Sequence, residues 1–248
     1  MKSLFEHLAL VDVDQEVVRN IVSQQYLQDP FNDLTSDPTE QLLAQQILDH
    51  IDSPMSSLQS RIVDHPFSDN RWYNTIHWPF RNWQASRFSD GTFGVWYGSK
   101  TIETTVYETA FHWYHNLLGD AGFEQHPIIA EREVYWVTCS TALLDFRKAV
   151  QEFPDLLHPS DYNFCQLIGK KIHREGHPGL LVPSVRHPAG ENFAIFSPNV
   201  LHTPQLAYSL TYCLEGEQIV VATSDSPAWL TIEVRQLQGK TLPEPSSK

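Results

Sequence analysis

The sequence is poor in basic residues and in cysteine. Lysine and arginine number 17 against 30 acidic residues, which gives a formal net charge of −13 over 248 residues. This balance offers no cationic surface for a phosphate backbone, so we expect no direct binding of nucleic acid. The three cysteines, Cys139, Cys165 and Cys213, form no CxxC pair. Their spacing argues against a disulfide scaffold or a thiolate zinc site and favours a reducing cytoplasm.

Long apolar runs are also absent. No stretch of 18 apolar residues occurs, so we expect no membrane span, and the N-terminus lacks the apolar core of a signal peptide. Hydrophobic residues nevertheless make up 41% of the chain and aromatic residues 12%. This composition is sufficient for a sizeable core and is not that of a disordered protein.

Glycine is missing from the first 57 residues, where the composition differs from that of the remainder. Apolar residues recur there at intervals that suit helices. They are Leu8, Val11, Val17, Val18 and Ile21, followed by Leu42, Leu43, Ile47 and Ile51. We therefore predict a helical N-terminal extension over residues 1–57, which could support a homodimer, and a main domain over residues 58–248.

The main domain contains short runs of β-branched and aromatic residues bounded by Gly, Pro, Asp or Ser, which are typical of strands. These runs cover residues 61–63, 94–97, 132–137, 179–182, 192–196 and 218–222. Helical patterns cover about 101–118 and about 162–175, the second ending at Gly176. Because strands and helices do not alternate regularly, the pattern predicts an α+β fold with a mixed or antiparallel sheet.

Two segments carry polar residues in a recognisable order. In the first, residues 86–115, an arginine lies in Arg87-Phe88-Ser89, Tyr97 ends a strand and Glu108 lies on the following helix. In the second, residues 177–201, Ser184 lies in the turn VPSVRHPAGEN, and Asn192 begins the next strand.

This order resembles the RES domain, a bacterial family named for its arginine, glutamate and serine. An arginine near the start of the domain is also typical, and Arg61 in SRIVD is its best counterpart. The resemblance covers about residues 58–222. It implies a fold like that of the diphtheria-toxin class of ADP-ribosyltransferases, with NAD+ as substrate. Most characterised members are toxins that deplete NAD+ and are paired with a DNA-binding antitoxin of the Xre type.

The residue types suit cleavage of the nicotinamide–ribose bond. That reaction passes through an oxocarbenium-like state, and Glu108 could stabilise its positive charge, orient the 2′-hydroxyl or polarise an attacking water. Tyr97 could stack on the nicotinamide ring. Arg87 and Arg61 could form forked hydrogen bonds to the diphosphate.

The second segment would complete this site. The Ser184 hydroxyl could bond the carboxamide or a ribose oxygen, with Asn192 as a supporting group. The acceptor could be water or phosphate, which would make the protein a glycohydrolase or a phosphorylase. Two alternatives stay open, a protein ADP-ribosyltransferase that uses the same pocket and a non-catalytic nucleotide-binding or interaction protein.

Other chemistries have weaker support in the sequence. Glu108, His112 and His115 share one helix face, but they do not form the HExxH pattern of zinc peptidases, so we expect no metal. Cys165 and His173 would lie about 12 Å apart along one helix, too far for a nucleophile and its base. Ser184 lacks the flanking glycines of a hydrolase nucleophile elbow.

Overall fold

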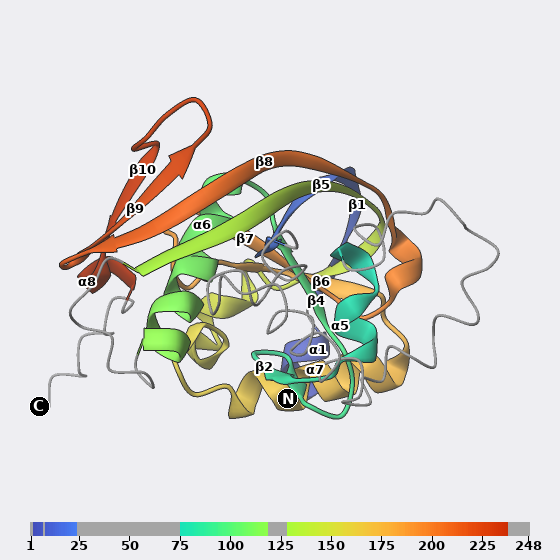
Figure 1. Ribbon diagram of the computed structural model, residues 1–248. Helices are drawn as coiled ribbons and strands as arrows, with labels where there is room; N and C mark the ends of the chain where they lie inside the picture. Colours follow the sequence, from blue (N-terminus) through green and yellow to red (C-terminus); the bar gives the residue numbers. More distant parts are fainter. Residues whose placement is uncertain (1, 7, 24–74, 119–127, 238–248) are drawn as a thin grey trace, which may run out of the picture.

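A computed structural model describes residues 2–6, 8–23, 75–118 and 128–237 of the chain (Figure 1). The helices are α1 (Lys2–Glu6), α5 (Trp78–Arg81), α6 (Ile102–His112), α7 (Asn163–Glu175) and α8 (Val234–Leu237). A π-helical segment, η2 (Trp113–Leu118), extends α6, and the 3-10 turns are η3 (Ala149–Gln151), η4 (Pro154–Leu157) and η5 (Pro198–Val200). The strands are β1 (Ala9–Val22), β2 (Ala85–Ser86), β3 (Ser89–Asp90), β4 (Trp96–Ser99), β5 (Ile128–Asp145), β6 (Gly179–Pro183), β7 (Glu191–Ile195), β8 (Leu201–Glu215), β9 (Gln218–Thr223) and β10 (Leu230–Glu233).

Eight of these strands form one mixed sheet in the order β1-β4-β7-β6-β5-β8-β9-β10. The β5–β6 pairing is parallel and the others are antiparallel. Because β1 pairs with both β4 and β5, the strands β1, β4, β7, β6 and β5 close into a ring. The predicted α+β class with a mixed sheet is therefore confirmed. Figure 1 shows β5 and β8 side by side as a long ribbon, with α6 beneath it and α7 at the opposite edge of the view.

The segment predicted to be the first N-terminal helix is instead strand β1, so that prediction is wrong. All fourteen of its residues pair with β5. Val17 and Val18 are both fully buried, Val17 in the core cluster around Trp96 and Val18 in the cluster around α6. Both faces of β1 are thus covered around these two residues, which explains why the apolar residues there do not alternate as in a strand with one solvated face. The predicted second helix, with Leu42 and Ile51, lies outside the described residues, as does the predicted boundary at residue 57.

The other predicted elements appear close to their expected positions, except that the strand expected over 132–137 is the much longer β5 and that residues 61–63 lie outside the described residues. The helix expected over about 101–118 begins after the N-cap Thr101, whose hydroxyl accepts a hydrogen bond from Thr104 N at 3.2 Å, and continues as a π-helix from Trp113. Helix α7 ends at Gly176 in the left-handed conformation, with φ of 77°. Strands β2, β3, β8 and β10 were not predicted. No described helix is long and apolar enough to cross a membrane.

Helix α7 approaches the β2–β3 hairpin very closely. A Cβ atom at Gly169 would lie only 1.8 Å from Phe88 O, so glycine is required at this contact. Phe88 is itself 1% exposed and packs in the core cluster with Ile168 and Ile172 of α7. This packing holds the neighbouring Arg87 at the edge of a cavity.

Candidate functional site

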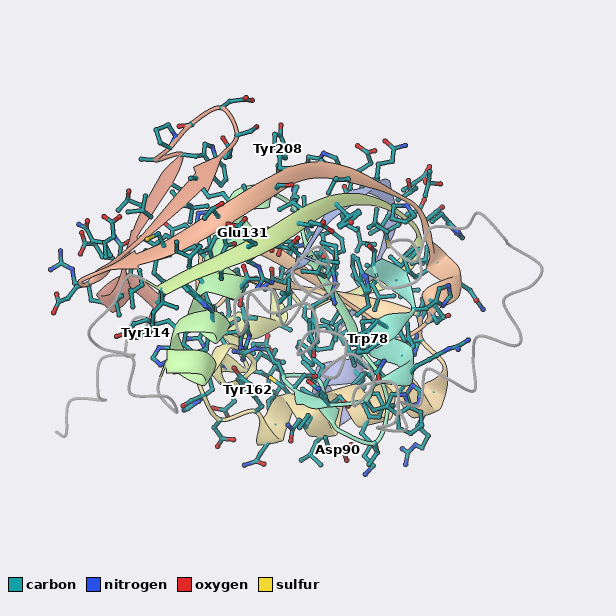
Figure 2. The ribbon with its side chains drawn as sticks, viewed as in Figure 1. Trp78, Asp90, Tyr114, Glu131, Tyr162 and Tyr208 are labelled. Atoms are coloured by element: carbon teal, nitrogen blue, oxygen red, sulfur yellow. The ribbon has the colours of Figure 1, made fainter. Side chains whose placement is uncertain are left out.

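A cavity of about 850 Å³ lies between the closed ring of strands and α6. Its lining comes from β1, the β2–β3 hairpin, β4, α6, the segment before α7 and the β6–β7 connection. Among the residues that line it are Arg19, Arg87, Tyr97, Glu108, His112, Tyr162, Arg186 and Asn192. One of these lining residues, Tyr162, is labelled in Figure 2. Four of the six residues predicted for the site therefore border one cavity.

The Glu108 carboxylate is held from the β6–β7 connection. Its Oε1 accepts hydrogen bonds of 2.6 Å from Ser184 Oγ and 2.6 Å from Asn192 Nδ2. No described group forms a hydrogen bond with the second oxygen, Oε2. One oxygen thus fixes the side chain, and the other is available to a ligand in the cavity.

Ser184 lies behind Glu108 rather than among the residues that line the cavity. Its hydroxyl oxygen accepts hydrogen bonds from the backbone N–H groups of Arg186 (3.2 Å) and His187 (2.9 Å). Its proton is therefore directed at Glu108. The geometry gives Ser184 the position of a group that orients the carboxylate.

Asn192 is oriented in the same way from strand β4. Ser99 Oγ donates a 2.6 Å hydrogen bond to Asn192 Oδ1, which turns the amide so that Nδ2 faces Glu108. Ser99 and Asn192 are paired across β4 and β7. The sheet register therefore sets the direction of this donor.

Arg87 is held at the cavity edge by neutral groups. Its guanidinium donates to His158 O at 2.8 Å and to Leu156 O at 3.4 Å, and it lies 4.4 Å from the centre of the Tyr162 ring. These contacts orient the cation, and none of them, among the described residues, comes from a carboxylate.

Tyr97 supports the loop that carries Arg87. Its hydroxyl accepts a hydrogen bond from Phe88 N at 3.0 Å and lies 2.9 Å from Ser86 Oγ. Burial raises the pKa of Tyr97 to about 12, so the phenol stays protonated at neutral pH.

Arg186 was not predicted as a site residue, although it lies in the VPSVR turn. It is only 3% exposed, and its guanidinium carbon lies 3.3 Å from the centre of the Phe111 ring. It donates hydrogen bonds to the carbonyl oxygens of Pro159 and Leu237. Burial lowers the pKa of this arginine. The sequence signal that could have identified Arg186 is its position two residues after Ser184.

Arg19 was also missed, because its segment was assigned to a helix. It donates to Tyr97 O at 2.5 Å, and its buried Nε has no hydrogen-bond partner among the described residues. Burial and the nearby Arg132 lower its pKa to about 10. Arg61, which was expected to supply an arginine from the start of the domain, lies outside the described residues.

The cavity concentrates positive charge within an acidic protein. None of Arg19, Arg87, Arg186 or the adjacent Arg132 belongs to a salt bridge within the described ranges. Glu108 is the carboxylate among the lining residues. Such a cavity is suited to an anionic ligand that carries more than one charge.

The described residues contain no cluster of three His, Cys, Asp or Glu side chains that could hold a metal ion.

The RES domain family model matches residues 59–215, well over half of the chain. The chain belongs to the RES domain family. The match includes the segments that carry Arg87, Tyr97, Glu108, Ser184 and Asn192. Strand β1 lies before the matched range, and yet this RES chain uses it to bring Arg19 to the cavity.

No curated protein matches this sequence significantly. Among solved structures, a chain from the crystal structure of the M. tuberculosis MbcT–MbcA toxin–antitoxin complex is similar, with 11% sequence identity and a TM-score of 0.45. That similarity covers 85% of this chain and 90% of the other.

Proposed function

We propose that this RES chain cleaves NAD+ at the bond between nicotinamide and ribose. The observation that carries the proposal is the Glu108 carboxylate, fixed through Oε1 and open at Oε2, in a cavity lined by arginines. Departure of nicotinamide leaves positive charge on the ribose carbon and ring oxygen. A preorganised carboxylate stabilises that charge without reorganising during the reaction.

The remaining residues supply binding and orientation. Arg87 and Arg186 present guanidinium groups that suit the NAD+ diphosphate, and Arg19 adds a third cation from β1. Tyr97 borders the cavity, and we assign its ring to the nicotinamide, while its hydroxyl is engaged by the Arg87 loop. Ser184 and Asn192 act through Glu108 as positioning residues.

The test is nicotinamide release from NAD+ by the purified chain. We expect release by the wild type and a loss of at least about 100-fold in Glu108→Gln, which keeps the size of the side chain and removes its charge. Glu152→Gln, at an exposed carboxylate, is the matched control and should keep full activity. An inactive wild type, or equal rates for the Glu108 and Glu152 variants, would overturn the proposal.

The same assay identifies the acceptor of the ADP-ribosyl group. Release that occurs in phosphate-free buffer indicates hydrolysis, whereas release that requires phosphate and yields a phosphorylated ADP-ribose indicates phosphorolysis. Transfer of labelled ADP-ribose to a protein would instead assign the alternative activity of this pocket. The proposal is hydrolysis or phosphorolysis.

We also propose that the chain acts as a toxin that depletes NAD+ in the cytoplasm and is restrained by an Xre-type antitoxin. The support is its membership of the RES family. Expression in bacteria should arrest growth and lower cellular NAD+, and Glu108→Gln should do neither. Growth arrest by both the wild type and Glu108→Gln would show that toxicity does not depend on NAD+ cleavage.

A further inference from the structure

His112 lies on the cavity wall one helical turn beyond Glu108. Residues four positions apart on a helix share a face, and both of these side chains border the cavity. The His112 ring contacts Phe111, with ring centroids 5.3 Å apart, and Phe111 in turn carries the Arg186 guanidinium. No described residue forms a hydrogen bond with either nitrogen of the His112 ring. His112 is exposed to solvent where it borders the cavity, and a solvent-accessible imidazole beside an arginine can bind a ligand.

Charged groups face His112 from four elements. Arg186 from the β6–β7 connection, Arg87 from the β2–β3 hairpin and Arg132 from β5 disfavour the imidazolium, and Glu108 from the same helix favours it. Desolvation by the surrounding protein is the largest effect on the pKa of His112, although the side chain is partly open to solvent, and together with these cations it lowers that pKa. The ring is therefore neutral at pH 7 in the free protein.

We propose that His112 is a third member of a diphosphate-binding wall with Arg87 and Arg186, and that it binds the diphosphate as the imidazolium. The proposal rests on the proposed function for the identity of the ligand, a nucleoside diphosphate joined to ribose. The two arginines are bonded to carbonyl oxygens and aromatic rings, and neither forms a salt bridge with a described residue.

The physical reason for proton uptake is the charge of the ligand. A diphosphate diester brings two negative charges between the guanidinium groups and cancels the repulsion that they exert on a protonated His112. Its oxygens also accept hydrogen bonds from the ring. Both effects favour the imidazolium in the complex, so binding takes up a proton between the pKa of the free protein and the higher pKa of the complex.

The test is binding of ADP-ribose, whose diphosphate does not titrate near neutral pH and which lacks the scissile nicotinamide bond. Calorimetry in two buffers of different ionisation enthalpy measures the protons taken up. We expect uptake of a fraction of a proton near pH 7 for the wild type. Its affinity should fall with rising pH by up to about 10-fold per pH unit across the titration window.

Three variants locate the effect. His112→Asn should abolish the uptake and flatten the pH dependence of affinity. His115→Asn changes the other imidazole that lines the cavity, and His202→Asn changes an exposed histidine on β8. Both should keep the uptake. Uptake that persists in His112→Asn, or that is lost in His115→Asn, overturns the proposal.

The outcome is separable from that of the proposed function. Nicotinamide release without proton uptake on ADP-ribose binding keeps the proposed function and rejects the role of His112. Proton-linked binding of ADP-ribose by a chain that releases no nicotinamide keeps the role of His112 and rejects the proposed function. Absence of ADP-ribose binding rejects the diphosphate wall.

Discussion

The Glu108 carboxylate receives two hydrogen bonds from described residues, both on a single oxygen. Each donor is oriented by a further contact. Ser99 fixes the Asn192 amide, and two backbone N–H groups fix the Ser184 hydroxyl. The orientation of one catalytic candidate therefore depends on residues from three segments of the chain, and variants of the donors should affect it in different ways.

Replacing Asn192 with aspartate should make the proposed activity depend on pH. A second carboxylate at hydrogen-bond distance from Glu108 raises the pKa of the pair, because two adjacent negative charges repel one another. We expect nicotinamide release to fall at least about tenfold at neutral pH and to recover partly towards pH 5, where a shared proton restores the hydrogen bond.

Asn192→Ala provides the comparison, since it removes the donor without adding charge. Its rate, measured relative to the wild type across the same pH range, should be lowered evenly. If the rate of Asn192→Asp relative to the wild type is also independent of pH, residue 192 does not act through the charge of Glu108.

Replacing Ser184 with alanine should reduce both activity and stability. The change removes one donor to Glu108 and leaves the amides of Arg186 and His187 without their acceptor. We expect about 1–3 kcal/mol less free energy of unfolding, measured with denaturant, and about a tenfold lower kcat for nicotinamide release. An unchanged kcat would contradict the positioning role of Ser184.

The resemblance of two segments to the RES pattern nominated Arg87, Tyr97, Glu108 and Asn192, and all four border the cavity. It could not nominate Arg19. That residue reaches the cavity only because β1 pairs with β5, more than 100 positions away in the sequence. Nor does a linear pattern reveal that Ser184 lies behind the carboxylate, which is a consequence of the turn geometry.

At the scale of elements, predictability followed the environment of each strand. Strands β6 and β7 are short and bounded by Gly or Pro, and their limits were predicted within one residue. Strand β1 is covered on both faces, so Val17 and Val18 are both buried and no alternation of period two is visible. In β8, the register against β5 shifts twice, and Thr203 has a positive φ of 48°. Such irregularities interrupt the pattern that identifies a strand.

The position of β1 in the ring predicts that the N-terminal segment is essential for folding. A chain that begins at residue 58 loses the strand that joins β4 to β5 and lacks buried residues of all three core clusters. We expect it to show no cooperative thermal transition by circular dichroism.

A point variant tests the same idea in the full-length chain. Val17→Asp buries a charge at a fully buried position and should prevent folding, whereas Glu16→Ala, at an exposed position of the same strand, should leave the melting temperature nearly unchanged. A soluble, cooperatively melting chain from residue 58 would show that β1 is dispensable.

At the scale of the whole molecule, the charge distribution is uneven. The chain carries a net charge of −13, and yet its cavity is lined by three arginines and one carboxylate. The acidic exterior disfavours polyanions such as DNA, because repulsion acts over the whole surface. A small dianion that enters the cavity instead meets cations that are partly withdrawn from solvent, where salt screens them less effectively.

This distribution predicts how a ligand stabilises the fold. The cavity draws on β1, β4, α6 and the β6–β7 connection, so a ligand that binds it binds only the folded chain. At 100 times its Kd, ADP-ribose should contribute about 2.7 kcal/mol, which corresponds to a rise of about 5–10 °C in melting temperature for a chain of this size.

Scanning fluorimetry measures the rise in melting temperature. It should persist in 0.3 M NaCl and largely disappear in the Arg87→Gln/Arg186→Gln double variant. An equal rise in that variant would place the ligand at another site, and a rise abolished by salt alone would indicate binding by exposed surface charges rather than by the partly buried arginines.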